Sequence, residues 1–415
     1  MGTVFIDELR QTPIEMQQLE IVERKGKGHP DSICDAIMDS ISVALCEAYI
    51  RRFGGILHHN VDKSLLVAGE AEIRFGGGEV RKPMLLVFGD RATTAYEGEE
   101  IPIEELVVRA AKEWFRKNMR FVDPDEHVRY QVELKPGSPS LVDIFKREKI
   151  GANDTSAAVG YAPMSRTERA VLEVERFLNS PEFKKEFPET GEDIKVMGLR
   201  LGNSLTLTIS MAFVDRFVPD EASYFRSKEV VIERIYDFVR EKFDFSDVRV
   251  ELNVLDRPGR GLGGVYLTVL GTSADSGDSG QVGRGNRVNG VIPLNRPTCS
   301  EAAAGKNPVS HVGKIYNVLT HKMADAIYRR VPGLREVYVW LLSQIGKPVD
   351  EPLVAASQVI LEPGTKLKEV EEQIKDVMEA ELDSIKDLVW KLAKGEIPIC
   401  ERLGRTGDLR YSRAL

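Results

Sequence analysis

Helix-like and strand-like hydrophobic patterns alternate along this chain, and this alternation limits the folds available to it more than any other feature. Apolar residues recur every three or four positions over four ranges, which predicts amphipathic helices at 33–48, 103–115, 231–243 and 367–392. Pro30 precedes the first range, at a point where a helix tolerates proline. Alternating or continuous apolar runs predict strands at 64–69, 82–89, 205–213, 248–254 and 337–342. We therefore expect helices packed on sheets, in α+β or α/β layers.

The length and composition describe a chain that can bury a large core. At ~150 residues per domain, 415 residues suggest two or three domains. Hydrophobic residues make up 42% and charged residues 29%, which argues against a largely disordered chain. The run VYVWLL at 337–342 is apolar on both faces of a strand, so we expect both faces to be covered.

The charge balance and the cysteines narrow the classes of function. The formal net charge is −8, and nucleic-acid and anionic-membrane binders usually need a basic footprint, so we predict neither partner. No run approaches the ~18 apolar residues of a membrane span. Cys34, Cys46, Cys299 and Cys400 show no metal-binding spacing, which is typical of reduced thiols in a cytoplasmic protein.

A glycine-rich stretch stands out at residues 271–290. Six of its twenty residues are glycine, against 35 of 415 in the whole chain, so its backbone can approach a ligand closely. Arg284 and the nearby Lys306 supply positive charge, and Asp275 and Asp278 supply carboxylates. A flexible surface loop is the alternative, but this density of charge favours a site for phosphates and a metal. The motif GxxxxGK[ST] is absent, which disfavours a Walker-type nucleotidase.

A second candidate is the segment KGKGHPDSICDAI at 25–37, directly before and within the first predicted helix. The free N–H groups and the dipole of a helix N-terminus bind anions. Asp31 in the first turn is a candidate to bring a metal to phosphates, and Asp35 follows on the same face. The alternative is that His29 and Asp31 only cap the helix.

Further polar residues follow predicted strands or occupy loops of small residues. Glu70 and Asp90 each come after a strand and a glycine, where binding residues often lie, although such carboxylates also form turns. The loops 135–143 and 151–163 either line a pocket or only connect elements. No GxSxG motif is present, so nucleophilic hydrolysis has no support.

The assembled motifs resemble the S-adenosylmethionine synthetase (methionine adenosyltransferase) family, and specifically its archaeal type, over essentially the whole chain. The segments that carry the resemblance are GKGHPDSICDAI, VAGEAEI, VFGDRAT, GANDTSAAVGYAPMS, GEDIKVMGLR, GTSADSGDSGQVGRGNRVNG and GKNPVSHVGKIYNV. The resemblance implies an α+β fold of three similar α/β-sandwich-like units around a pseudo-threefold axis. We place these units at about 1–125, 126–270 and 271–415, with interleaving expected.

The resemblance also implies a reaction and its participants. The family transfers the adenosyl group of ATP to the sulfur of L-methionine, then hydrolyses the triphosphate to pyrophosphate and phosphate. The expected metal cofactor is Mg²⁺, with K⁺ as a further candidate. The expected assembly is a homodimer with active sites at the subunit interface.

Matching motifs assign roles to individual residues. The catalytic residues are His29, placed near the leaving oxygen, Arg284 and Lys306. The metal ligands are Asp31 for Mg²⁺ and Glu70 for K⁺. The acids that bind methionine and the nucleoside are Asp90, Asp154 and Asp278. The ATP-binding residues are Lys135, Pro136, Gly137, Ser138, Pro139, Ser140, Asp278, Arg284 and Lys306.

The sequence departs from the bacterial and eukaryotic branch at several of these positions. Ser32 stands where that branch has a lysine, and Gly313 stands where it has a second magnesium-ligating aspartate. Either the second metal site is missing or another acid, such as Asp275, supplies it. Lys195 is a candidate substitute for a phosphate-binding lysine of that branch.

Two other functions stay open from the residues alone. One is a ligase or kinase with a non-Walker phosphate loop, which would release ADP or AMP. The other is a nucleotide-sensing protein without catalysis, which would bind ATP and release no phosphate in response to methionine.

Overall fold

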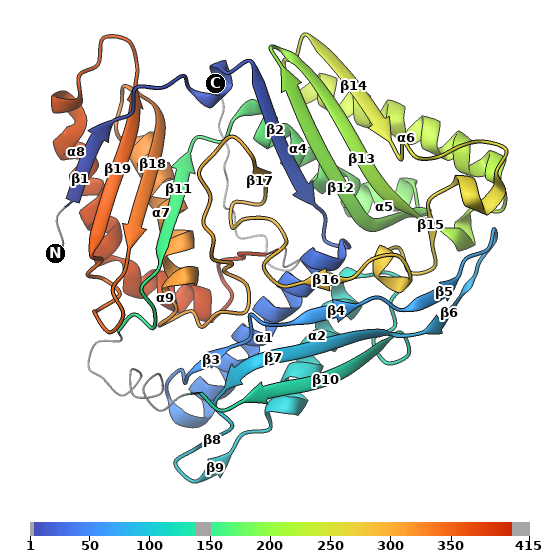
Figure 1. The fold of residues 1–415 in the computed structure, drawn as a ribbon, viewed down its shortest axis with the longest axis horizontal. Coiled ribbons are helices and arrows are strands. Elements are labelled where there is room, and N and C mark those ends of the chain that lie inside the picture. Colours follow the sequence, from blue (N-terminus) through green and yellow to red (C-terminus); the bar gives the residue numbers. More distant parts are fainter. Residues whose placement is uncertain (1–3, 138–150, 401–415) are drawn as a thin grey trace.

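The computed structural model describes residues 4–137 and 151–400, and three sheets of four or more strands form the framework of these residues (Figure 1). Sheet A lies at the left of the view, sheet B at the upper right and sheet C at the bottom. Each sheet packs helices onto one face, so the architecture is mixed α+β, as the alternating pattern predicts.

Sheet A combines the N-terminal strand with strands from the last third of the chain. Its order is β1 (Val4–Glu8), β19 (Val354–Leu361), β18 (Leu334–Leu342) and β11 (Ala157–Ala162). Its helices are α7 (Val312–Arg330), α8 (Leu367–Asp383) and α9 (Ile385–Ala393).

Strand β18 contains the run VYVWLL. Val337, Val339 and Leu341 are buried in the core beneath α7, and Tyr338 is buried on the opposite face, where its hydroxyl accepts from Arg296 at 3.0 Å. Trp340 is 36% exposed, so the prediction that both faces are covered is wrong at this position.

Sheet B is built on a long hairpin. Its order is β14 (Asp247–Leu252), β13 (Ser204–Val214), β12 (Thr190–Leu201), β2 (Leu19–Lys25) and β17 (Ile292–Pro293), with β15 (Leu267–Thr268) beside β13. Its helices are α4 (Arg166–Leu178), α5 (Pro181–Glu186) and α6 (Glu221–Lys242). The predicted strands at 205–213 and 248–254 are confirmed, with small shifts of their ends. The helix predicted at 231–243 is also present, but it begins ten residues earlier, at Glu221.

Sheet C packs against the helix that follows Pro30. Its order is β10 (Val128–Lys135), β7 (Met84–Ala92), β4 (Leu65–Val67) and β16 (Gly280–Gln281), with β3 (His59–Asn60) beside β7. Its helices are α1 (Pro30–Phe53) and α2 (Ile103–Asn118), both of which were predicted. Proline begins α1, and Gly54 ends it with φ of 73°.

Short elements complete the described chain. Two hairpins pair β5 (Glu70–Glu72) with β6 (Glu79–Lys82) and β8 (Ala95–Tyr96) with β9 (Glu99–Glu100). Single 3-10 turns lie at Ile14–Met16, Asp215–Phe217, Gly261–Gly264 and Ser273–Asp275. None of the helices in the described ranges has the length and apolar content that crossing a membrane requires.

The predicted helix over 367–392 is interrupted, and the expectation of one continuous helix is wrong. Ser384 has φ of −86° and ψ of 3°, and it separates α8 from α9. Its hydroxyl donates to the carbonyl of Glu381 at 2.9 Å, a local bond that competes with the helical ladder. Ile374 and Ile385, on either side of the break, still pack into the core of sheet A.

The glycine-rich stretch connects sheets B and C. Strand β16 pairs with β4 of sheet C, and β17 pairs with β2 of sheet B. Figure 1 shows β16 and β17 near the middle of the view, between the three sheets. The stretch is therefore held near its middle by β16 and just beyond its end by β17. It passes the N-terminal end of α1, where Gln281 donates to Asp31.

Candidate active site

The two segments singled out in the sequence meet at the N-terminal end of α1. His29 caps this helix, and its Nδ1 accepts from the backbone N–H of Asp31 at 3.2 Å. The Oδ1 of Asp31 accepts from the backbone N–H of Gln281, in the glycine-rich stretch, at 2.9 Å. The capping role of His29 is thus confirmed, and it places the imidazole beside the loop that was predicted to bind phosphates.

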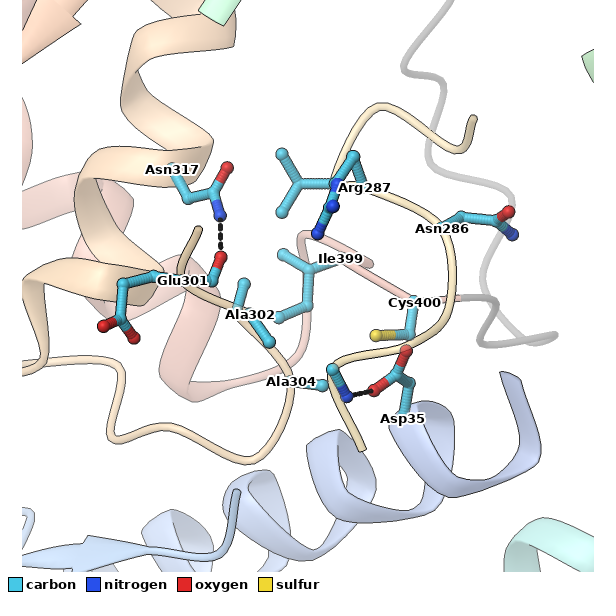
Figure 2. A pocket seen from close by; sticks show the side chains of 12 residues that line it. Asp35, Asn286, Arg287, Glu301, Ala302, Ala304, Asn317, Ile399 and Cys400 are labelled. Atoms are coloured by element: carbon cyan, nitrogen blue, oxygen red, sulfur yellow. Dashed lines mark hydrogen bonds between the residues drawn. The ribbon is translucent and has the colours of Figure 1, made fainter. Parts of the chain in front are cut away.

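One helical turn further on, Asp35 holds the same loop. Its Oδ1 accepts from the N–H of Gly283 at 2.6 Å, and its Oδ2 accepts from the N–H of Gly285 at 3.0 Å. Burial raises the pKa of Asp35 to about 7, although these two backbone bonds favour the ionised form. Figure 2 shows the carboxylate pointing from α1 towards the loop, beside a cavity of about 20 Å³ that Glu301, Asn317 and Cys400 also line.

Two lysines add positive charge at this end of α1. Lys25 Nζ lies 3.0 Å from Asp31 Oδ2 and donates to the carbonyl of Arg284 at 2.7 Å. Lys195 Nζ lies 3.4 Å from Glu23 Oε1. Burial lowers the pKa of His29 to about 4; Asp31 opposes this, and the two lysines add to it. His29 is therefore neutral near pH 7, and because Nδ1 accepts a bond, its proton is on Nε2.

We call Lys25, His29, Asp31, Lys195 and Arg284 the α1 cluster. Arg284 joins it through its backbone, and its side chain is exposed. Asp278 is also exposed, and its charge raises the pKa of His29 slightly, which places it near this cluster.

Asp275 has a structural role instead. It is fully buried, and its Oδ2 accepts from the N–H groups of Val269 at 2.7 Å and Leu270 at 2.9 Å. Ser276 donates to the other oxygen at 2.9 Å. These contacts within its own loop give no support to the suggestion that Asp275 supplies a second metal ligand.

Lys306 lies in a separate buried group. Its Nζ is 2.5 Å from Asp62 Oδ2 and 3.2 Å from Glu301 Oε2, and its side chain is 3% exposed. Asn60 Nδ2 donates to Asp62 Oδ1 at 2.8 Å and to Asp90 Oδ2 at 3.0 Å. Burial alone would raise the pKa of Asp62, but the Lys306 ammonium holds it well below its usual range. Asp90 is therefore linked to Lys306 through Asn60 and Asp62.

His311 repeats at α7 the arrangement of His29 at α1. It caps α7, and its Nδ1 accepts from the N–H of Gly313 at 3.2 Å. Burial lowers the pKa of His311 to about 3, and the charge of Lys306 lowers it further. We call Asp62, Asp90, Glu301, Lys306 and His311 the Lys306 cluster.

The two clusters are separated along α1. The hydroxyl of Ser42 donates to the carbonyl of Lys306 at 3.1 Å. Ser42 lies about three turns beyond Asp31, or about 16 Å along the helix axis at ~1.5 Å per residue. The structure therefore brings His29, Asp31, Asp278 and Arg284 into one neighbourhood, and Asp90 and Lys306 into another.

The remaining predicted site residues show only local contacts. Glu70 is in the β5–β6 hairpin, and its exposed carboxylate accepts from Lys82 at 3.0 Å. Asp154 is exposed, and its Oδ1 accepts from the N–H of Thr155 at 2.7 Å. Among the described residues, neither Glu70 nor Asp154 forms a hydrogen bond or an ion pair with the two clusters.

The segment 135–140 is described only in part. Lys135 Nζ lies 3.2 Å from Glu133 Oε2. Gly137 lies against His58, because a Cβ at this position would stand 2.4 Å from the imidazole Nδ1. Pro136 is exposed. Ser138, Pro139 and Ser140 lie outside the described residues.

A larger cavity of about 700 Å³ opens beside Lys195. Its walls combine apolar side chains with hydroxyls, among them Met197, Thr208, Ser210 and Leu255. Leu255 is 87% exposed, so this wall is open in the single chain. The cavity is large enough for a nucleoside or an amino acid.

Metal binding by this chain alone has little support from the described residues. No three His, Cys, Asp or Glu side chains in 4–137 and 151–400 stand close enough together to hold an ion. Mg²⁺ at phosphate sites usually takes one or two carboxylates and completes its shell with substrate phosphates and water. Asp31 fits that limited role.

Three members of these clusters, Asp62, Glu301 and Lys25, were not predicted as site residues. Asp62 has no signal in the sequence, because its partner Lys306 lies 244 residues away. Lys25 is part of the motif at 25–37, but its bond to Arg284 spans 259 residues. The regular spacing of Asp31, Asp35 and Asp39 on one helix face was a usable signal, since the first two bind the glycine-rich stretch and the third binds Lys314 of α7.

Comparisons with known proteins agree with the motifs. The family model described as S-adenosylmethionine synthetase (AdoMet synthetase) matches residues 2–396. An S-adenosylmethionine synthase of Methanothermobacter thermautotrophicus is 47% identical over 399 residues, which cover 96% of this chain and 99% of that protein. One from Pyrococcus furiosus is 48% identical over 400 residues, with 95% and 99% covered.

The fold is also similar to a solved structure. An unusual S-adenosylmethionine synthetase from Campylobacter jejuni superposes with a TM-score of 0.60 at 17% identity, covering 91% of this chain and 94% of that chain. At this identity the likeness concerns the fold alone. Since the family model and the relatives each cover almost the whole chain, this chain belongs to the S-adenosylmethionine synthetase family.

Proposed function

We propose that this chain transfers the adenosyl group of ATP to the sulfur of L-methionine, and then hydrolyses the triphosphate to pyrophosphate and phosphate. Family membership supports the first step. The observation that carries the assignment of the site is the meeting of His29 and the glycine-rich loop at the N-terminus of α1.

The transfer needs charge stabilisation and alignment more than acid–base chemistry. The thioether of methionine is a neutral nucleophile, so attack on C5′ of ATP requires no general base. Negative charge grows on the triphosphate as the C5′–O bond breaks, and preorganised donors stabilise that charge. The α1 cluster offers Lys25, Lys195 and Arg284, and His29 offers its Nε2–H. Holding sulfur, carbon and oxygen in line supplies much of the remaining rate enhancement.

Mg²⁺ is the proposed cofactor, with Asp31 as its protein ligand. When bound, the ion would neutralise part of the triphosphate charge. In the described structure Lys25 pairs with the Asp31 oxygen that faces it, at 3.0 Å. A K⁺ site at Glu70 stays a proposal, and the exposed ion pair between Glu70 and Lys82 gives it no support.

A homodimer with its active sites at the interface would bring the two clusters together. Within one chain the two α1 residues that contact these clusters, Asp31 and Ser42, lie about 16 Å apart along the helix axis. In a dimer, Lys306 and Asp90 of one subunit would complete the α1 cluster of the other. Exposed apolar residues on strands and loops, such as Leu65, Leu255 and Trp340, suit a buried surface between subunits. A fully active monomer in analytical ultracentrifugation would overturn the dimer.

The finer points of architecture and location belong to the same proposal. Each of the three sheets has its own hydrophobic core, which supports three similar units around a pseudo-threefold axis. The division at about 1–125, 126–270 and 271–415 needs interleaving, because sheet A begins with β1 and sheet C ends with β16. The four free cysteines suit a cytoplasmic location, and neither a nucleic acid nor a membrane is proposed as a partner.

One experiment separates this function from the two alternatives. The purified chain is incubated with ATP, L-methionine and Mg²⁺, and the nucleoside products are identified by mass spectrometry. S-adenosylmethionine that forms only when methionine is present supports the proposal. ADP or AMP would indicate a kinase or ligase, and unchanged ATP with measurable binding would indicate a sensor.

A further inference from the structure

The backbone around Arg284 is held on both sides, while its side chain is exposed. Asp35 accepts from the N–H groups of Gly283 at 2.6 Å and Gly285 at 3.0 Å, the residues that flank Arg284. Lys25 Nζ donates to the carbonyl of Arg284 itself at 2.7 Å. Within the described ranges, no hydrogen bond or ion pair to the guanidinium is found. An exposed arginine on a fixed backbone is preorganised for an anion.

The glycines on either side fit this contact with Asp35 closely. Gly283 has φ of 88°, a conformation that favours glycine. A Cβ at Gly285 would stand 2.2 Å from Asp35 Oδ2, so a side chain there would push the loop away from the carboxylate. The two glycines that flank Arg284 thus allow the close contact between the loop backbone and the carboxylate of Asp35, which lies about 250 residues away in the chain.

Asp35 has no cationic side chain as a hydrogen-bond partner among the described residues. Asp39, one turn further on, differs: its Oδ1 pairs with Lys314 at 2.8 Å. Both carboxylates are buried on α1; Asp35 holds the glycine-rich loop, and Asp39 pairs with Lys314 of α7. Asp39 therefore provides a matched control.

We propose that Asp35 is a positioning residue that fixes the backbone at Gly283 and Gly285, so that Arg284 is presented to the triphosphate. This inference rests on the proposed function, because it takes a polyphosphate as the ligand of Arg284. Asp35 itself does not contact the substrate. Its effect therefore passes through Arg284, and this dependence can be measured.

The first test uses Asp35→Asn, which keeps the shape of the side chain but can accept from only one of the two N–H groups in the same geometry. We expect its affinity for inorganic tripolyphosphate, measured by calorimetry, to fall about tenfold or more. The value of kcat/KM for ATP should fall by a similar factor. The upper limit is the roughly 100- to 1000-fold loss that follows removal of an aimed donor.

A double-mutant cycle then asks whether the effect passes through Arg284. In an Arg284→Ala background, Asp35→Asn should change the tripolyphosphate affinity by less than about twofold, since there is no guanidinium left to position. An undiminished effect of Asp35→Asn in that background would overturn the proposal.

Two further variants separate positioning from stability. Asp39→Asn should lower the melting temperature and leave the tripolyphosphate affinity unchanged. If Asp39→Asn loses as much affinity as Asp35→Asn, any loss of a buried charge on α1 is sufficient to weaken binding, and the positioning role of Asp35 is overturned. Gly285→Ala leaves Asp35 intact and displaces the loop, so it should reproduce the loss of affinity. If Asp35→Asn does not fold, Gly285→Ala decides the question.

The experiment distinguishes failure of this inference from failure of the proposed function. A wild-type chain that makes no S-adenosylmethionine but binds tripolyphosphate through Arg284 and Asp35 refutes only the function. A wild-type chain that makes S-adenosylmethionine while Asp35→Asn binds tripolyphosphate normally refutes only the inference.

Discussion

Replacing His29 separates the two half-reactions that we assign to this chain. Its Nδ1 accepts from the N–H of Asp31, so its Nε2–H is the group left to donate to a ligand. Negative charge develops on the oxygen bound to C5′ only while the adenosyl group leaves. Hydrolysis of tripolyphosphate breaks a P–O bond instead, and its need for this donor is smaller.

The structure allows the two contributions of His29 to be estimated separately. Losing the cap on α1 should cost about 1 kcal/mol of stability. Losing a donor aimed at the leaving oxygen should cost roughly 3–4 kcal/mol at the transition state, or about 100- to 1000-fold in rate. His29→Ala should therefore nearly abolish S-adenosylmethionine formation, while hydrolysis of added tripolyphosphate falls much less.

His29→Asn is the matched variant, because asparagine is a good helix cap but lacks the imidazole Nε2–H. It should keep the melting temperature of the wild type and lose S-adenosylmethionine formation as His29→Ala does. Both rates and the melting temperature are measured on the same preparations. If both rates fall in parallel in His29→Ala, and His29→Asn restores them together with the melting temperature, His29 only caps the helix.

Three further predictions follow from other contacts. Asp31→Asn should raise the Mg²⁺ concentration needed for half-maximal activity, since a hard cation prefers a charged oxygen; an unchanged titration would contradict the ligand role. Lys314→Ala removes the buried ion pair with Asp39 and should lower the free energy of unfolding by about 3–5 kcal/mol, measured by urea denaturation. Burial raises the pKa of Asp193 to about 7, although the hydrogen bonds that it accepts from Ser273 act to lower this pKa. The folded chain therefore favours the protonated carboxyl of Asp193, and this contribution to the free energy of unfolding is present below about pH 4 and lost as the pH rises through 7. Asp193→Asn does not titrate, so its stability relative to wild type should increase over that range. A constant difference would contradict this.

Much of the fold could be predicted because its elements follow local hydrophobic periods. The α1 pattern, with Pro30 at its start, specifies a helix wherever it packs, and the alternation over 205–213 specifies a half-buried strand. The break at Ser384 was not predictable in this way, because the apolar pattern continues across it. The exposure of Trp340 was not predictable for a similar reason. The sequence shows that both faces of its strand are apolar, but it does not show what covers each face.

The sequence by itself determined the chemistry at the N-terminus of α1. A histidine, a carboxylate and a glycine-rich run are recognisable from residue types and spacing, and the cap of His29 is a contact between near neighbours. Tertiary structure alone decided which distant groups these residues meet. Asp31 binds Gln281, Asp35 binds the glycines beside Arg284, and Lys306 is buried against Asp62, each across more than 240 residues. Such contacts depend on how the sheets pack around α1, and hydrophobic periodicity, which is local, does not encode that arrangement.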